Sequence, residues 1–193
     1  MGPKCWNNLR GSLGRLWKFA QLQNAILRKE KTVLDWVPTK KLKATSREIY
    51  TPDEMKKLLK ACDREMLPIF ALGGFAVIRS AELTGVGERE VLHQRLVPLL
   101  PNLRAWLQPY RNEKGLLWKL KHMHRMDKLQ EDSGVRLKHN ALRHSFCTYR
   151  ASTEKDLAKV ALEAGNSVTM LQQHYVRVQL EEVGRAWFAI VPK

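Results

Sequence analysis

The sequence predicts a mainly α-helical protein with at most a small β-sheet. Three observations support this fold class: a clear helix start at Thr51, a series of helical patterns between residues 137 and 189, and only one short stretch with strand character. Hydrophobic residues make up 44% of the 193 residues, which is enough to bury a core and excludes wholesale disorder. The chain is long enough for one ordinary domain, or for a small domain beside a larger one.

The first segment, residues 6–29, places apolar residues at roughly helical spacing. They are Leu9, Leu13, Leu16, Trp17, Ala20 and Ile26. Basic residues surround this stripe, so the segment is either a helix that packs on one face and binds phosphate on the other, or a solvated amphipathic helix. Residues 35–48 contain Pro38, several lysines and no periodicity, and we interpret them as a basic linker. We therefore expect a partial helical segment with its linker at residues 1–44 and a second domain at residues 45–193.

The second domain begins with a well-defined helix signal. Thr51 fits the N-cap, Pro52 the first helical position and Glu54 the third position of a capping box. The apolar segment 67–83 is long enough for a buried helix, and residues 96–99 have the character of a short strand. Further helices are predicted to start near Pro101 and to cover residues 115–132, 137–150, 154–164, 167–177 and 179–189.

The net charge of +15 is concentrated in two blocks of the sequence. Residues 1–50 hold 11 Lys and Arg against 3 Asp and Glu, and residues 116–150 hold 8 against 3. Residues 51–115 hold 10 against 8, and residues 151–193 hold 5 against 5. Such an excess favours a polyanionic partner, either nucleic acid or an acidic membrane surface. Two contact surfaces on one polyanion would explain the separation better than a need for solubility alone.

Membrane insertion and secretion are not expected from this sequence. The longest apolar run, residues 67–78, is too short to span a bilayer and is interrupted by Gly73 and Gly74. The N-terminus has no apolar region of the signal-peptide type. The three cysteines are widely spaced and odd in number, which is typical of reduced thiols. We therefore expect a soluble cytoplasmic chain with no membrane partner.

Two arginines stand in apolar helix patterns. Arg79 ends an almost entirely apolar segment, where a charge is costly unless it is paired, for instance with Glu82, or faces a ligand. Arg143 raises the same question inside the sequence NALRHSF. Two guanidinium groups held by packed helices can bind one phosphate, because each can donate two parallel hydrogen bonds to its oxygens. Tyr175, on a later predicted helix, could supply a phenolic nucleophile.

The histidines do not indicate a metal site. His122 and His124 are two residues apart and would point to different faces of a helix, and no cysteine or carboxylate stands at a spacing that completes a site. We expect them on a solvated basic helix near DNA. His144 is expected to be a packed, hydrogen-bonded histidine that braces the Arg143 helix. The sequence also lacks a glycine-rich phosphate loop, so no cofactor is expected.

In this order, the motifs resemble the tyrosine recombinase (phage integrase) family. The matching stretches are RSAEL, which begins at Arg79, NALRHSFCTYR around Arg143, and AGNSVTMLQQHY, which ends at Tyr175. The resemblance covers about residues 45–193 and implies the catalytic-core fold of DNA breaking-rejoining enzymes. The preceding basic helix resembles the last part of a core-binding domain.

The resemblance implies a mechanism without metal or cofactor. Tyr175 would attack a DNA phosphate, form a 3′-phosphotyrosine and release a 5′-hydroxyl, and a second strand end would reverse the step. Arg79 and Arg143 would neutralise the charge that develops on the non-bridging oxygens. The resemblance further implies double-stranded DNA as the partner and self-association on that DNA.

The chain departs from the family pattern at three places. Asn140 stands where the family usually has His or Lys, and it cannot act as a general base near neutral pH. Asn166 stands where the family usually has His or Trp, and it can still donate a hydrogen bond to a phosphate oxygen. The family's β-hairpin, with its general-acid lysine, is reduced here to the interval 84–95, which contains no lysine. We do not expect Arg89, Arg95 or His93 to replace that acid.

Three functions remain open at this stage. The leading one is a site-specific recombinase that cuts and rejoins DNA through Tyr175. The second is a DNA-binding remnant of an integrase that no longer cleaves, and the third is DNA relaxation of the type IB topoisomerase kind. Binding to duplex DNA should fall steeply with salt in all three cases, because bound phosphates release counterions.

Overall fold

The computed structural model describes residues 1–26, 31–41, 47–78, 97–113, 123–175 and 181–192. The chain divides into two compact units, Met1–Ser46 and Arg47–Lys193, which are considered separately. The sequence predicts the boundary between the two units after residue 44, two residues before the observed one. Among the described residues, no helix combines the length and the apolar character needed to cross a bilayer.

The smaller unit consists of a long helix, α1 (Pro3–Leu22), and a returning segment with the short 3₁₀ helix η1 (Val33–Asp35). Arg10 of α1 joins them, because its Nε and Nη2 donate to the carbonyls of Val37 and Leu34 at 2.6 and 2.9 Å. The helix begins earlier and ends earlier than the predicted range 6–29. It ends where Asn24 takes a left-handed conformation with φ of 56°.

The larger unit is mainly helical, as predicted. Its first helices are α2 (Pro52–Ala61) and α3 (Leu67–Phe75), followed by α5 (Pro101–Leu107), the 3₁₀ helix η2 (Gln108–Tyr110) and α6 (Met123–Ser133). The chain then forms α7 (Ala141–Thr153), α8 (Leu157–Ala164), α9 (Val168–His174) and α10 (Glu181–Phe188). The predicted capping box at the start of α2 is confirmed, since Glu54 N donates to Thr51 Oγ1 at 3.1 Å and Thr51 N donates to Glu54 Oε2 at 2.7 Å.

No β-strand occurs among the described residues, so the expected small sheet is not found there. Residues 97–99 of the predicted strand have no strand partner, and residue 96 lies outside the described part. A lone extended stretch is not a stable element, because each strand needs a neighbour for its backbone hydrogen bonds. The ends of four predicted helices, residues 79–83, 115–122, 176–177 and 179–180, also lie outside it.

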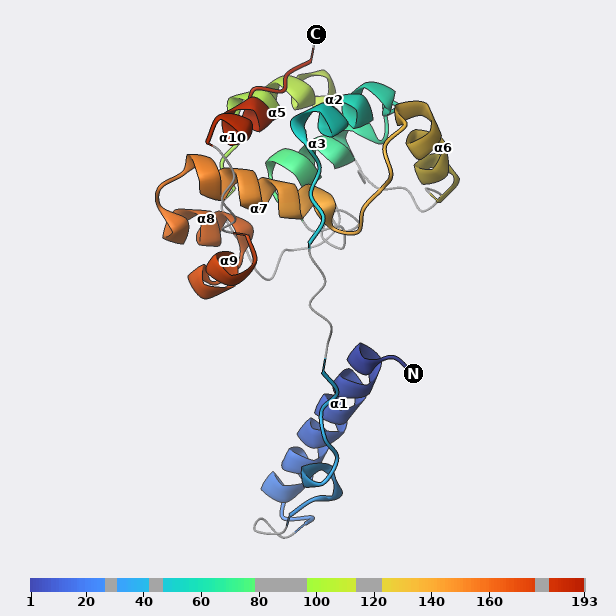
Figure 1. Ribbon diagram of the computed structural model, residues 1–193, viewed down its shortest axis with the longest axis vertical. Helices are drawn as coiled ribbons and strands as arrows, with labels where there is room; N and C mark the ends of the chain where they lie inside the picture. The colour runs from blue at the N-terminus through green and yellow to red at the C-terminus, as the bar shows by residue number, and fades with distance from the viewer. Residues whose placement is uncertain (27–30, 42–46, 79–96, 114–122, 176–180, 193) are drawn as a thin grey trace. The chain divides into compact units, whose positions relative to one another are not determined.

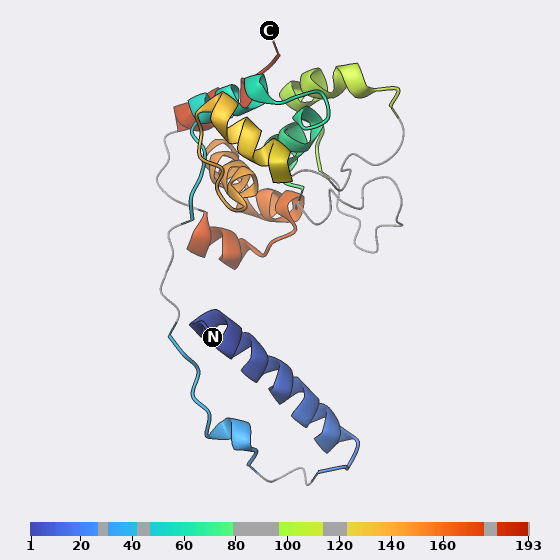
Figure 2. The same ribbon diagram turned by 90° about the vertical axis from the view of Figure 1, so that its right-hand side faces the viewer.

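Helix α7 occupies the centre of the larger unit (Figure 1). It packs against α3 and α10 on one side and against α8 on the other, and α8 in turn contacts α9. Figure 2 shows α6, coloured yellow, across the front of this unit, where it packs on α2. The larger hydrophobic cluster lies between α2, α3, α5, α6, α7 and α10, and includes Trp187, which is fully buried. A smaller cluster lies between α7, α8 and α9 and includes Phe146, Cys147 and Leu171.

Candidate functional site around Tyr175

Arg143 is held by backbone carbonyls at the side of α7. Its Nη1 donates to Val77 O at 2.7 Å, and its Nη2 donates to Ala164 O and, at 3.1 Å, to Asn166 Oδ1. The side chain therefore ties the end of α3 to the end of α8. Val77 has a φ of 54°, a left-handed conformation that β-branched residues rarely adopt. The hydrogen bond from Arg143 stabilises this backbone and orients the guanidinium at the same time.

Asn166 is positioned by the turn between α8 and α9. Gly165 ends α8 with a φ of 59°, a conformation that glycine adopts without strain, and Asn166 N donates to Ala161 O at 2.9 Å. Ser167 then caps α9 through its hydroxyl, which accepts from Met170 N at 3.1 Å. Asn166 Nδ2 is buried and has no acceptor among the described residues. A buried amide donor without an acceptor is costly, so this group can gain from a ligand oxygen or a water.

Tyr175 lies directly after α9 and faces the smaller hydrophobic cluster. Its side chain is 4% exposed and packs in the same cluster as Cys147 and Leu171. The phenolic oxygen lies 3.1 Å from His144 Nδ1, and the two rings are tilted by 43° with centroids 5.5 Å apart. His144 follows Arg143 on α7, so one helix carries both the arginine and the partner of the tyrosine.

The electrostatics of the site favour a neutral histidine and a neutral phenol in the free protein. Burial lowers the pKa of His144 to about 4, and the positive charges of Arg47, Arg143 and His139 act in the same direction. Its ring is therefore neutral near pH 7, and Nδ1 can accept the phenolic proton when Nε2 carries the ring proton. Burial is also the main cause that raises the pKa of Tyr175, with Cys147 adding to it, while Arg47 and Arg143 oppose this shift.

Arg47 brings a second guanidinium to Tyr175. Its Cζ lies 4.9 Å from the centre of the Tyr175 ring, within the range of a cation–π contact. The residue belongs to the segment before α2, more than a hundred positions away in sequence. The sequence analysis missed Arg47, because a basic residue in a basic linker carries no local signal of such a contact.

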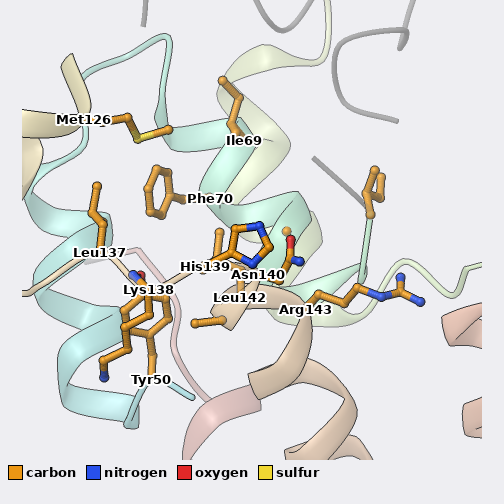
Figure 3. A pocket seen from close by; sticks show the side chains of 13 residues that line it. Tyr50, Ile69, Phe70, Met126, Leu137, Lys138, His139, Asn140, Leu142 and Arg143 are labelled. Carbon is orange, nitrogen blue, oxygen red and sulfur yellow. The ribbon is translucent and has the colours of Figure 1, made fainter. Parts of the chain in front are cut away.

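A pocket of about 270 Å³ is lined in part by Arg143 and by the residues that precede α7. Figure 3 shows His139 and Asn140 grouped among its apolar side chains, with the Arg143 side chain extending away from them. Asn140 precedes α7 in a left-handed conformation, with a φ of 56°, and its side chain is exposed and makes no capping hydrogen bond to the helix. Asn140 therefore lines a pocket next to the arginine and is not part of the Asn166–Arg143 hydrogen bonding.

The structure thus brings together part of the predicted site. Arg143 contacts Asn166 directly, and Tyr175 joins them through His144, the residue that follows Arg143. Arg79 lies outside the described residues, as do His93 and the whole interval 84–95. The pairing of His144 with the tyrosine was not predicted, although its expected role as a hydrogen-bonded histidine of the Arg143 helix agrees with its position.

Within the described part of the chain, no three His, Cys, Asp or Glu side chains are grouped so that they could hold a metal ion. Comparison with known proteins found no matching family model, no matching curated protein and no matching solved structure.

Proposed function

We propose that this protein binds double-stranded DNA and cuts and rejoins it through a covalent bond between Tyr175 and a 3′-phosphate. The observation that carries this proposal is the 3.1 Å distance between the Tyr175 hydroxyl and the neutral His144, which follows Arg143 on α7, and the hydrogen bond between Arg143 and Asn166. These are the groups that a phosphoryl transfer to a phenol requires: a proton acceptor, a cation and a neutral hydrogen-bond donor. The chain's net charge of +15 supports a polyanionic substrate.

The proposed first step transfers one proton and replaces one phosphate ester bond by another. The phenolic proton of Tyr175 passes to His144 Nδ1, and the phenolate oxygen attacks the phosphorus of the scissile phosphate. The bond between phosphorus and the 5′-oxygen breaks, and this oxygen takes a proton from solvent, since the interval 84–95 offers no lysine. Arg143 and the Asn166 amide would stabilise the charge on the non-bridging oxygens. Rejoining reverses each bond change and uses no external energy source.

A second candidate function is binding of DNA without cleavage, and one observation favours it. The Tyr175 side chain is only 4% exposed, and Arg143 donates to protein carbonyls in place of a ligand. A phosphate could reach the tyrosine only if this surrounding were rearranged. Either function places the protein on duplex DNA, where copies of the chain would associate with each other.

A trapping experiment separates the two functions. Nicked duplexes of random sequence are incubated with the wild-type protein and with Tyr175→Phe, and covalent adducts are detected on a denaturing gel. The matched control is Tyr110→Phe, since Tyr110 lies in η2 and its hydroxyl donates to Arg64 O at 2.8 Å, far from the proposed chemistry. Cleavage predicts an adduct with wild type and Tyr110→Phe that is lost with Tyr175→Phe.

The remaining outcomes are equally informative. Salt-sensitive duplex binding with no adduct in any variant would establish binding without cleavage. Stronger competition by single-stranded RNA than by duplex DNA, or no duplex binding at low salt, would contradict both functions. An adduct that persists in Tyr175→Phe would show that another residue is the nucleophile.

A further inference from the structure

Arg47 is fixed in place by the residues that follow it. Tyr50, only 2% exposed, donates its backbone N–H to Ser145 Oγ at 2.8 Å and accepts from Tyr149 Oη at its carbonyl at 2.9 Å. Its phenolic oxygen also accepts from Lys138 N at 2.8 Å. Ser145 and Tyr149 both belong to α7, the helix that carries Arg143 and His144. The segment that begins with Arg47 is therefore attached to the helix that carries the site.

The guanidinium of Arg47 lies against Tyr175 itself. The distance of 4.9 Å from its Cζ to the ring centre places a positive charge beside a phenol that packs in the smaller hydrophobic cluster. The other groups that face Tyr175 come from α7: Arg143, the neutral His144, and Cys147. Arg143 already donates to Val77 O, Ala164 O and Asn166 Oδ1.

We propose that Arg47 is a positioning residue for Tyr175: it holds the phenol ring and stabilises the ionised oxygen when the proton leaves. Its role in ionisation stands independently of DNA, whereas its role in cleavage rests on the function proposed above. A phenol buried in an apolar cluster ionises with difficulty, because burial disfavours the charged form. A cation at short range offsets this desolvation cost by stabilising the phenolate. Because Arg47 lies at the end of the basic linker, the reactivity of Tyr175 depends on the docking of this segment onto α7.

The chain provides a matched control for this inference. Arg64 lies over the ring of Tyr110 with its Cζ 5.8 Å from the ring centre, so it makes the same kind of contact with a tyrosine that has no proposed role. The two pairs belong to the same unit but to different elements. Replacing either arginine by glutamine removes one positive charge and keeps a polar, shorter side chain.

The first measurement follows the ionisation of each tyrosine in the DNA-free protein. The chain has four tyrosines, so their ring carbon signals can be labelled with carbon-13 and assigned by single Tyr→Phe substitutions. We expect Arg47→Gln to move the titration of Tyr175 to higher pH and to leave Tyr110 unchanged. Arg64→Gln should do the reverse, and Arg47→Lys should keep Tyr175 close to wild type. An unchanged Tyr175 titration in a folded Arg47→Gln variant would overturn the inference.

The second measurement is the rate of adduct formation on the nicked duplexes. We expect at least a roughly ten-fold loss with Arg47→Gln near pH 7, partial rescue with Arg47→Lys, and a shift of the rate profile toward higher pH. Equal loss in both variants, with no shift of the profile, would indicate a merely structural role and would refute the inference. A shifted Tyr175 titration with no adduct in any protein would leave the role of Arg47 in ionisation standing and would disprove cleavage.

Discussion

The two longest helices that the structure describes in full bury their apolar residues in opposite ways. α1 of the smaller unit extends over 20 residues without a single buried side chain, and Leu16 and Phe19 are 63% and 58% exposed. α7 of the larger unit has 13 residues, of which six are buried. The smaller unit is held together mainly by polar contacts such as those of Arg10, whereas the larger unit has two clusters of buried hydrophobic residues.

The difference in burial between α1 and α7 indicates which residues stabilise the fold. An isolated helix gains little stability in water, because most helical stability in proteins comes from a packed apolar face. Substitutions in the larger unit should therefore cost free energy of unfolding, and similar substitutions in α1 should not.

Trp187→Ala should have the largest effect. Trp187 is fully buried, stacks on Tyr149 with ring centroids 4.9 Å apart, and donates from Nε1 to Gly74 O at 3.1 Å. Removing it leaves a cavity and an unsatisfied carbonyl, which should reduce the free energy of unfolding by about 3–5 kcal/mol. Urea denaturation followed by circular dichroism measures this loss. The control is Trp36→Ala in the smaller unit, since Trp36 is 74% exposed and its removal should change stability by less than about 0.5 kcal/mol.

Breaking the buried ion pair between α7 and α8 should have the second largest effect on stability. Arg150 donates from Nε and Nη2 to the carboxylate of Glu163 at 3.0 and 3.1 Å, and the Glu163 side chain is 5% exposed. Arg150→Met leaves this charge buried without its partner, which should cost about 3 kcal/mol. The control is Arg185→Met, which breaks an exposed pair with Glu181 and should cost less than about 0.5 kcal/mol. Equal losses in thermal unfolding would contradict the importance of burial.

His144 should make the larger unit sensitive to acid. Its pKa of about 4 in the folded protein lies below the usual value of 6.5, so the unfolded chain binds a proton more readily. The contribution of the neutral His144 ring to the free energy of unfolding is therefore fully present above pH 6.5 and is lost as the pH falls from there toward 4. Because the ring is only half-buried, we expect a loss of about 2 kcal/mol. His144→Gln cannot titrate but can still accept from Tyr175, so stability measured against pH should lose this component; an unchanged profile would refute the assignment.

The features that the sequence could predict are local, and those that it could not are tertiary. The capping box at Thr51 depends on residues within four positions, and it formed as expected. The left-handed Gly165 and the cap at Ser167 are local in the same way and bring Asn166 to Arg143. The contact of Arg47 with Tyr175 depends instead on how a linker docks onto α7, which no spacing in the sequence reveals. The strand expected at residues 96–99 needed a partner, and a short pattern cannot indicate whether one exists.

Substitution of two glycines, one in each unit, gives the most direct comparison of the two units. A Cβ added at Gly184 of α10 would lie 2.4 Å from Ser152 Oγ and 2.9 Å from the backbone oxygen of Tyr149, so α10 would have to move away from α7. Gly184→Ala should therefore lower the free energy of unfolding by about 2 kcal/mol. Gly11 of α1 has no atom within 4 Å of the added Cβ, so Gly11→Ala should stabilise α1 by up to about 1 kcal/mol through its higher helix propensity. Amide hydrogen exchange of α1 and α10 measures both effects, and a destabilised α1 in Gly11→Ala would mean that this helix is packed against another surface in solution.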